Sequence, residues 1–342
     1  MVLDFQNIDD AIADAKNKSG DISLILGNGF SSAYGECFRY PTLKSRAEIP
    51  NLSRPKDRIF EESGSDDFET TMRRMSYTTS MLRLYSQGSS SDICCQIEND
   101  RLLIKNALVE TLADIHPPSS RSIDSIKYRR TRSLIRKFSR IYSLNYDLLL
   151  YWATLNSDSD GEGIIGTDGF YKDGDSLVWR GHPSTATTKI YYLHGGMHLY
   201  YDEEDKKIHK LSNQKGKTII SQVRENLNNG HYPCVVTEGS SKDKIKRILE
   251  SNYLNTSYES LDTLSGSLFT FGASLDKNDN HIFDKASGAP NLHSLYIGVR
   301  NPHSASAINI NARAQEIKKH HDDKNGKQLT LKFYNSSVPG VW

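Results

Sequence analysis

Short apolar runs recur along the chain, and turn residues follow most of them. An apolar run that ends in turn residues is typical of a strand buried in a sheet. We therefore predict a strand at each of these runs: Ile22–Leu26, Arg140–Leu144, Ile190–Leu193, Cys234–Thr237, Leu268–Gly272, Ser294–Val299 and Leu329–Phe333.

Helical patterns separate several of these predicted strands. They cover Leu148–Thr154, Lys242–Leu254, Asn280–Lys285 and Ala305–His320. Strands that alternate with helices favour a parallel sheet with helices on its faces. We expect an α/β fold with a Rossmann-like, mainly parallel sheet and helices on both faces. Ligands of such sheets bind beyond the carboxyl ends of the strands.

One long stretch, from about Pro41 to Lys137, interrupts the alternation. It has helical spacing over Phe68–Tyr85, Ile97–Ile115 and Ser122–Phe138. We therefore expect one domain over residues 1–342, with a helical insertion at residues 41–139 after the first βα unit. The Rossmann-like core would comprise residues 21–40 and 140–342. Residues 157–184 predict a β-hairpin or loop, and residues 200–232 predict an exposed polar segment.

Composition narrows the class of protein. Of the 342 residues, 37% are hydrophobic and 25% are charged, which suits a globular protein with a sizeable core. No apolar run approaches the roughly 18 residues that span a membrane, and the acidic, amphipathic start does not resemble a signal peptide. The cysteines lack the paired spacing of a structural zinc site and suit reduced thiols: Cys37, Cys94, Cys95 and Cys234. We expect a cytoplasmic protein without a bound metal.

The overall net charge of +1 gives no indication of nucleic-acid binding. The segment Lys127 to Arg140, however, carries seven basic residues and no acidic one. It could contact nucleic acid or an acidic partner. The alternative, which we favour, is a solvated basic helix face.

The first predicted strand is followed directly by Gly27-Asn28-Gly29-Phe30-Ser31-Ser32. Two glycines around one residue let the backbone turn sharply and come close to a bound group. The amides at the start of a following helix would then face that group, and phosphate is its usual chemistry. A tight turn without a ligand is the alternative.

Two further strand ends carry polar side chains. Asn145 and Asp147 follow one strand, and His194 follows the next, beside Gly195 and Gly196. Asn145 can donate and accept hydrogen bonds, whereas Asp147 either caps a helix or faces a ligand. His194 is placed to act as a general base, although a lone histidine is more often satisfied by the backbone.

Two later strand ends complete the set. Gly272 and Ser274, with Asp276 close behind, could meet a ribose or phosphate, or form an ordinary turn capped by Asp or Asn. Glu238 could face the same crevice, and Ser240 or Ser241 is expected to cap the Lys-rich helix that follows.

In order and position, these motifs resemble those of the sirtuin-like family of NAD-binding proteins. Gly27-Asn28-Gly29-Phe30-Ser31 is similar to the family's Gly-Ala-Gly-x-Ser loop, and Asn145-Tyr146-Asp147 to its Asn-x-Asp. His194-Gly195 is similar to its catalytic His-Gly, and Gly272-Ala273-Ser274 to its later Gly-x-Ser. The Asn-Tyr-Asp form and the run Glu238-Gly239-Ser240-Ser241-x-x-Lys244 resemble a bacterial branch that includes NAD-destroying enzymes of antiphage defence.

This resemblance implies that the chain cleaves the bond between nicotinamide and ribose in NAD. The catalytic residues it implies are His194, Asn145 and Asp147. His194 would take a proton from the ribose hydroxyl or from water, and Asn145 would orient the ribose or the water. Asp147 would contact the carboxamide or stabilise positive charge nearby. The NAD-binding residues it implies are Gly27, Asn28, Gly29, Phe30, Ser31, Gly195, Glu238, Gly272, Ser274 and Asp276. The family's zinc ribbon is absent and Leu144 replaces its glutamine, so protein deacylation is not expected.

With no acyl-lysine site, water is the expected acceptor, which implies an NAD glycohydrolase. Its control would come from self-assembly as a homo-oligomer, from the helical insertion, or from a partner protein such as an ATPase. Three alternatives remain open. The chain could bind NAD or ADP-ribose as a regulatory module without turnover, it could transfer ADP-ribose to an acceptor, or it could bind nucleic acid through Lys127 to Arg140.

Overall fold

The computed structural model describes residues 2–86, 91–157, 161–174, 176–202, 204–214, 216–237, 240–338 and 340–342. Within them the strands are β1 Ile22–Leu26, β2 Arg140–Ser143, β3 Phe170–Asp173, β4 Ser176–Trp179, β5 Lys189–Tyr192, β6 Leu199–Tyr201, β7 Ile208–Lys210, β8 Ser265–Phe271, β9 Asn291–Val299 and β10 Thr330–Asn335. The α-helices are α1 Ile8–Ser19, α2 Asn28–Tyr34, α3 Tyr40–Arg46, α4 Lys56–Ser63, α5 Phe68–Tyr85, α6 Ser91–Ile115, α7 Ser125–Ile135, α8 Leu149–Leu155, α9 Ile219–Asn228, α10 Ser241–Leu249, α11 Asn252–Glu259, α12 Asn280–Ser287 and α13 Ala305–Asn325.

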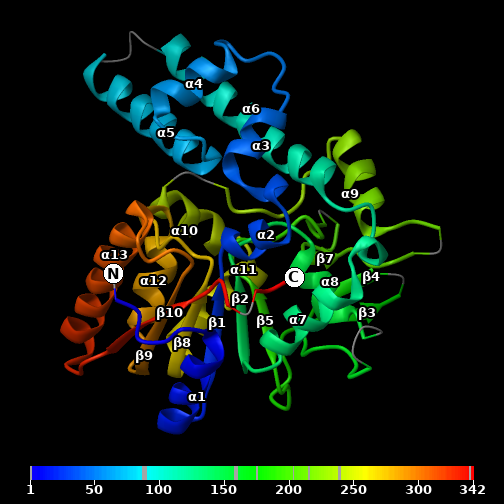
Figure 1. Ribbon diagram of the computed structural model, residues 1–342. Coiled ribbons are helices and arrows are strands. Elements are labelled where there is room, and N and C mark those ends of the chain that lie inside the picture. Colours follow the sequence, from blue (N-terminus) through cyan, green and yellow to red (C-terminus); the bar gives the residue numbers. More distant parts are fainter. Residues whose placement is uncertain are drawn as a thin grey trace.

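A six-stranded parallel sheet forms the centre of the molecule, which confirms the α/β, Rossmann-like prediction (Figure 1). Its strand order is β10-β9-β8-β1-β2-β5, and every neighbouring pair is parallel. The chain moves outward from β1 to β2 and β5, then returns to the other side of β1 at β8. The order therefore reverses between β1 and β8, and ligands of open parallel sheets bind at such a reversal.

Side chains of the central strands alternate between two apolar cores, one on each face. Leu24 and Leu26 of β1 pack in one core with α1, α7 and α8, whereas Ile25 packs in the other with α12 and α13. This alternation follows from the two-residue repeat of a strand. Since both faces are covered by helices, β1 is buried along its whole length, which explains why every residue except the buried Ser23 is apolar.

The predicted helical insertion lies between β1 and β2. Helices α3, α4, α5 and α6 lie together beyond the carboxyl ends of the strands, at the top of Figure 1. Helix α5 has the predicted bounds, Phe68–Tyr85. By contrast, α7 returns to the sheet, where Leu134 and Ile135 are buried in the core with α1 and α8. The part of the insertion that lies over the carboxyl ends of the strands is therefore α3 to α6.

Two of the predicted elements are wrong. Cys234–Thr237 forms no strand, only an isolated bridge between Val235 and Gly195, because it hydrogen-bonds with the loop after β5. Its apolar side chains reflect burial rather than sheet pairing. The helix predicted over Lys242–Leu254 is two helices, since Ser251 caps a new one at the Leu254 amide.

The segment between β2 and β8 contains a second, antiparallel sheet with strand order β3-β4-β7-β6. The hairpin of β3 and β4 lies within the stretch for which a hairpin or loop was predicted. The exposed polar segment predicted at residues 200–232 is wrong over α9. There Ile219, Val223 and Leu227 recur at helical spacing and are buried.

The basic segment Lys127 to Arg140 is largely engaged within the protein. Arg132 is fully buried and donates to the Ala153 and Thr154 carbonyls. Arg140 donates to Thr263, and Lys137 pairs with Asp9. These contacts give Arg132, Arg140 and Lys137 a structural role, whereas Arg129 and Arg130 are exposed on α7. No helix among the described residues has the length and apolar character to cross a membrane.

Candidate functional site

A cavity of about 270 Å³ opens at the carboxyl ends of β1, β2, β5 and β8. It therefore lies where the strand order reverses. Residues that follow these four strands line the cavity, together with residues of α3, α5 and α6 from the insertion. The lining residues are Gly27, Asn28, Gly29, Tyr40, Leu43, Asp67, Glu69, Leu108, Leu112, Leu144, Asn145, Tyr146, Asp147, His194, Gly272, Ala273, Ser274 and Asp279. The structure thus brings most of the predicted site residues to one place.

The glycine loops after β1 and β8 pack backbone against backbone. The Gly27 amide donates to the Phe271 carbonyl over 3.0 Å, and the Gly29 amide donates to the Gly272 carbonyl over 2.8 Å. A Cβ at Gly29 would lie 2.4 Å from the Gly272 Cα. These two amides are therefore already bonded, and the glycines serve close loop packing. Both loops line the cavity, and Asn28 and Ser274 are the polar side chains that they contribute to it.

Replacing Gly272 with alanine is expected to lower the free energy of unfolding by roughly 2–5 kcal/mol. Its φ is +67°, and a Cβ would lie 2.5 Å from the Gly29 Cα, so a backbone penalty of about 1–2 kcal/mol adds to overpacking of about 1–3 kcal/mol. Gly326→Ala is the matched control, because Gly326 has φ +63° with open space around it. Denaturant unfolding measures both. Equal losses in the two variants would contradict the packing argument.

Asn145, Asp147 and Ser31 form a buried polar group beneath the cavity. The Asn145 Nδ2 donates to the Gly27 carbonyl over 3.0 Å and to the Ser31 Oγ over 2.9 Å. Both amide hydrogens are then used, so Oδ1 is the atom of this side chain that remains for a ligand. Asp147 accepts from the Ser31 hydroxyl and, over 2.8 Å, from the Leu149 amide. Asp147 thus satisfies the first amide of α8 and also lines the cavity.

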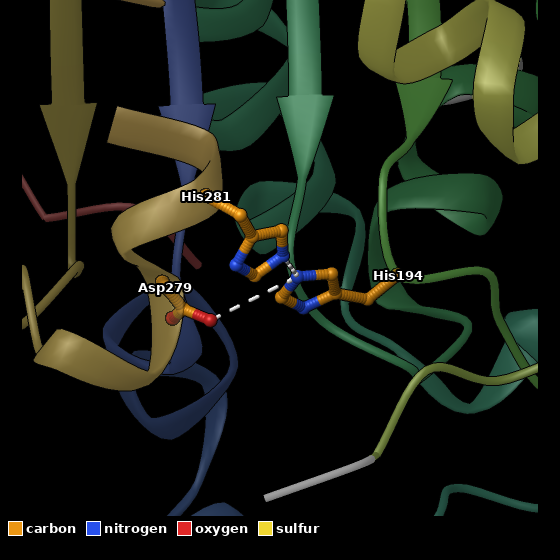
Figure 2. A group of neighbouring side chains, drawn as sticks. All are labelled: His194, Asp279 and His281. Atoms are coloured by element: carbon orange, nitrogen blue, oxygen red, sulfur yellow. Dashed lines mark hydrogen bonds and ion pairs between the residues drawn. The ribbon is translucent and has the colours of Figure 1, made fainter. Parts of the chain in front are cut away.

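His194 is buried at the end of β5, with 1% of its surface exposed. Its Nε2 lies 3.2 Å from the Nε2 of His281 on α12 and 3.8 Å from the Asp279 Oδ1 (Figure 2). Burial, aided by the positive charge of Lys244, holds the pKa of His194 well below its usual value. The imidazole is therefore neutral at pH 7, which is the form that can accept a proton.

Gly195 gives the loop after His194 its shape. Its φ is +72°, and a Cβ there would lie 1.9 Å from the Cys234 carbonyl oxygen. The segment beside it is held by the Gly196 amide, which donates to that carbonyl, and by the Val236 amide, which donates to the His194 carbonyl. Gly195 therefore lets the segment around Cys234 fix the backbone that carries His194.

Charged residues for which the sequence predicts no role form the far wall of the cavity. Lys244 of α10 is fully buried, and its Nζ lies 2.5 Å from the Glu69 Oε2 and 2.8 Å from the Asp279 Oδ1. Glu69 comes from α5 of the insertion. The Tyr146 hydroxyl lies 2.5 Å from the other Glu69 oxygen. In the sequence, Lys244 looks like an ordinary lysine on a helix capped by serine. Apart from its place in the run that resembles the bacterial sirtuin-like branch, nothing local indicates that it belongs to a buried charged cluster.

Burial and charge shift the pKa values of this cluster in opposite directions. Burial raises the pKa of Glu69 to about 7, although Lys244 partly counteracts it. Burial would also raise the pKa of Asp279, but the nearby Lys244 and His194 lower it to about 2. Desolvation lowers the pKa of His281 to about 3. At neutral pH the cluster therefore holds a cationic Lys244, an anionic Asp279 and two neutral histidines.

The same residues raise the question of a metal ion. His194, Asp279 and His281 offer three ligand atoms within 4.8 Å of one another, and imidazole with carboxylate suits several divalent metals. The Asp279 Oδ1, however, already bonds the protonated Lys244, whose charge opposes a second cation in a buried site. We therefore interpret the trio as a hydrogen-bonded cluster and assign no metal to it.

The remaining predicted residues lie away from the cavity or outside the described residues. Phe30 is buried against Trp342, with ring centroids 5.1 Å apart. Asp276 caps the turn at the Asn278 amide and lies 3.7 Å from the Arg73 guanidinium. Glu238 lies outside the described residues. Ser240 caps α10 at the Asp243 amide, as one of the two predicted serines should.

A family model described as a domain of unknown function, DUF4917, covers residues 24–342 of the chain. No curated protein matches the chain.

Proposed function

The chain belongs to the DUF4917 family, whose function is unknown, and from its own residues we propose that it hydrolyses NAD to nicotinamide and ADP-ribose. One observation carries the proposal. Four strand ends far apart in the sequence converge on one cavity at the strand-order reversal, with a buried neutral histidine among them. The order of these motifs, which resembles that of sirtuin-like NAD-binding proteins, supports the same substrate.

The proposed reaction needs one base and one oriented water molecule. The bond between ribose C1′ and the nicotinamide nitrogen breaks, and its electron pair neutralises the pyridinium. The water oxygen bonds to C1′, and its proton passes to the His194 imidazole. The Asn145 Oδ1 would orient that water or the ribose, since both hydrogens of its amide are already bonded within the protein. Asp147 would act as an anion near the positive charge that develops on the ribose.

The size of the cavity agrees with this assignment. Ligand pockets usually measure roughly 300–1,000 Å³, so about 270 Å³ suits one end of a dinucleotide, such as nicotinamide with its ribose. The apolar wall formed by Leu43, Leu108 and Leu112 suits the nicotinamide ring. The diphosphate would lie toward Asn28 and Ser274, where the glycine loops border the cavity.

The direct test incubates the purified protein with NAD and measures nicotinamide and ADP-ribose by chromatography. The proposal expects the two products in equal amounts. Nicotinamide without free ADP-ribose would instead favour transfer to an acceptor or cyclisation. Stabilisation of the fold by NAD without any nicotinamide release would favour a non-catalytic binding module and overturn the proposal.

Replacing Asn145 with alanine is expected to lower kcat for nicotinamide release by roughly 10²–10³-fold. That is the effect usual for removing one polar group that orients the reacting atoms. Asn229→Ala is the control, because Asn229 is exposed at the end of α9. Thermal unfolding establishes that both variants are folded. A folded Asn145→Ala protein with the wild-type kcat would remove Asn145 from the mechanism.

An enzyme of this kind would deplete its host of NAD unless it were controlled. We include in the proposal that control comes from self-assembly, from the insertion, or from a partner such as an ATPase. Of these, the insertion has a direct route, since α3, α5 and α6 all line the cavity.

A further inference from the structure

The insertion does more than border the cavity, because Glu69 enters the charged cluster of the core. Its two carboxylate oxygens lie 2.5 Å from the Lys244 Nζ and 2.5 Å from the Tyr146 hydroxyl. Lys244 bonds the Asp279 Oδ1, and that oxygen lies 3.8 Å from the His194 Nε2. A continuous chain of polar contacts thus runs from the insertion to the proposed base.

Helix α5 is also tied to the core beside this chain. The Asn278 Nδ2 donates to the Thr70 Oγ1 over 3.2 Å, and the Arg73 guanidinium lies 3.7 Å from the Asp276 carboxylate. Asp67 caps α5 at the Glu69 and Thr70 amides, so the first turn of the helix is fixed. Glu69 is therefore held against Lys244 by the surrounding structure and does not depend on one contact alone.

The charges of this cluster decide whether His194 can take up a proton. Lys244 is fully buried, the Asp279 side chain is 20% exposed, and the two have opposite charges. With a neutral Glu69, a protonated His194 would leave one uncompensated positive charge in the protein interior. With an ionised Glu69, the same protonated state is neutral overall. An uncompensated buried charge is costly, so the ionised form of Glu69 favours proton uptake by His194.

We propose that Glu69 is a positioning residue of the site, which acts through Lys244 and Asp279 to let His194 accept the proton. This inference rests on the proposed NAD hydrolysis. It makes the insertion part of the catalytic arrangement, because displacement of α5 would remove the negative charge that offsets Lys244. It also supplies a physical link between the position of the insertion and the rate of the reaction.

The hydrogen bonds of the Tyr146 hydroxyl depend on whether Glu69 is protonated. The hydroxyl lies 2.5 Å from the Glu69 Oε1 and 2.9 Å from the Val236 carbonyl, but it has only one proton to donate. When Glu69 is ionised, Tyr146 donates to it. When Glu69 is protonated, Glu69 donates to Tyr146, and Tyr146 can donate to Val236. Protonation of Glu69 therefore changes hydrogen bonding on the segment that also fixes the backbone of His194.

The expected pH dependence follows from the groups around Glu69. Those that face it are Lys244 of α10, Asp279 before α12, Asp67 before α5, Tyr146 after β2 and Tyr40 of α3. Burial raises the pKa of Glu69 to about 7 against the opposing charge of Lys244. Because the ionised form is the active one, kcat should fall as the pH drops through about 7. His194 itself stays neutral in this range, since its pKa lies well below 6.5.

The test compares wild type, Glu69→Gln and the control Glu62→Gln, whose side chain is exposed on α4. We expect Glu69→Gln to lower kcat roughly 10–10²-fold, a part of the usual general-base contribution, with little change in KM for NAD. It should also lose the pH transition near 7, which the control keeps. In spectra of ¹⁵N-histidine-labelled protein, the His194 ring signals should shift near pH 7 in wild type and not in Glu69→Gln.

The two readouts separate the two proposals. If wild type releases no nicotinamide, the NAD hydrolysis fails, while the ¹⁵N spectra still decide whether Glu69 acts on His194. If wild type is active and Glu69→Gln keeps both the rate and the pH transition, the role of Glu69 is overturned. If Glu69→Gln does not fold, Glu69→Asp takes its place. Glu69→Asp keeps the carboxylate, so it must keep the pH transition near 7. Absence of that transition in Glu69→Asp would overturn the inference.

Discussion

Replacing His194 with glutamine is expected to lower kcat for nicotinamide release by roughly 10²–10⁴-fold, the usual contribution of a general base. Glutamine keeps a polar side chain of similar length, but it cannot take up a proton near neutral pH. NAD should still bind, since the diphosphate end would lie on the loops that contain Asn28 and Ser274. The expected signature is therefore a large fall in kcat with a KM close to that of wild type.

The control for this experiment is His293→Gln. His293 is exposed on β9 and does not line the cavity, so its replacement should leave the rate unchanged. Thermal unfolding of both variants shows whether the fold is kept. A folded His194→Gln protein that releases nicotinamide at the wild-type rate would exclude His194 as the base.

Replacing Lys244 with methionine is expected to lower the free energy of unfolding by about 3–5 kcal/mol, as when one partner of a buried ion pair is removed. Lys244 is fully buried and contacts both Glu69 and Asp279. Methionine has a similar length but no charge, so both carboxyl groups would lose their buried cation. Denaturant unfolding of the two proteins measures the loss.

The pH dependence gives this prediction a definite sign. Without Lys244, burial acts unopposed and raises the pKa of Glu69 above the value of about 7 that it has in wild type. A carboxyl whose pKa is raised by folding contributes most to stability below its unfolded pKa, and this contribution is lost as the pH rises through the folded pKa. The deficit of Lys244→Met relative to wild type should therefore grow as the pH rises through about 7.

A second substitution tests the cause of the loss. Lys244→Met combined with Glu69→Gln removes the carboxylate as well as the cation, so the double variant should recover part of the stability. It should also depend less on pH than Lys244→Met alone. A double variant whose losses simply add would show that Glu69 and Lys244 do not interact.

Local sequence patterns determined the sheet and the edge at which the site lies. The apolar run Ile22–Leu26 is β1 residue for residue, because a strand covered on both faces favours apolar side chains, with the buried Ser23 as its polar residue. The convergence of Asn145 and His194 on one cavity was likewise predictable, since the carboxyl ends of neighbouring parallel strands meet at one edge. Asn145 follows β2 and His194 follows β5, and these two strands are parallel neighbours in the sheet.

Local patterns failed where burial or capping decided the outcome. Val235 and Val236 are apolar because they are buried, yet they lie beside the loop of Gly195 and belong to no strand. The glycines of the first loop were predicted to approach a phosphate. That role stays a prediction, and the same glycines line the cavity and also pack against another loop at Gly272, which is 243 residues further along the chain than Gly29.

The charged cluster could be found only in the tertiary structure. Glu69 lies on an amphipathic helix of the insertion, and Lys244 follows it by 175 residues on another helix. Neither position differs locally from an exposed charge on a helix. Strand ends are brought together by backbone pairing, which leaves a pattern in the sequence. Helices such as α5 and α10 meet through side-chain packing, which leaves none. The sequence by itself therefore determined the sheet and the strand-end residues, and the packing of the insertion decided which charges surround His194.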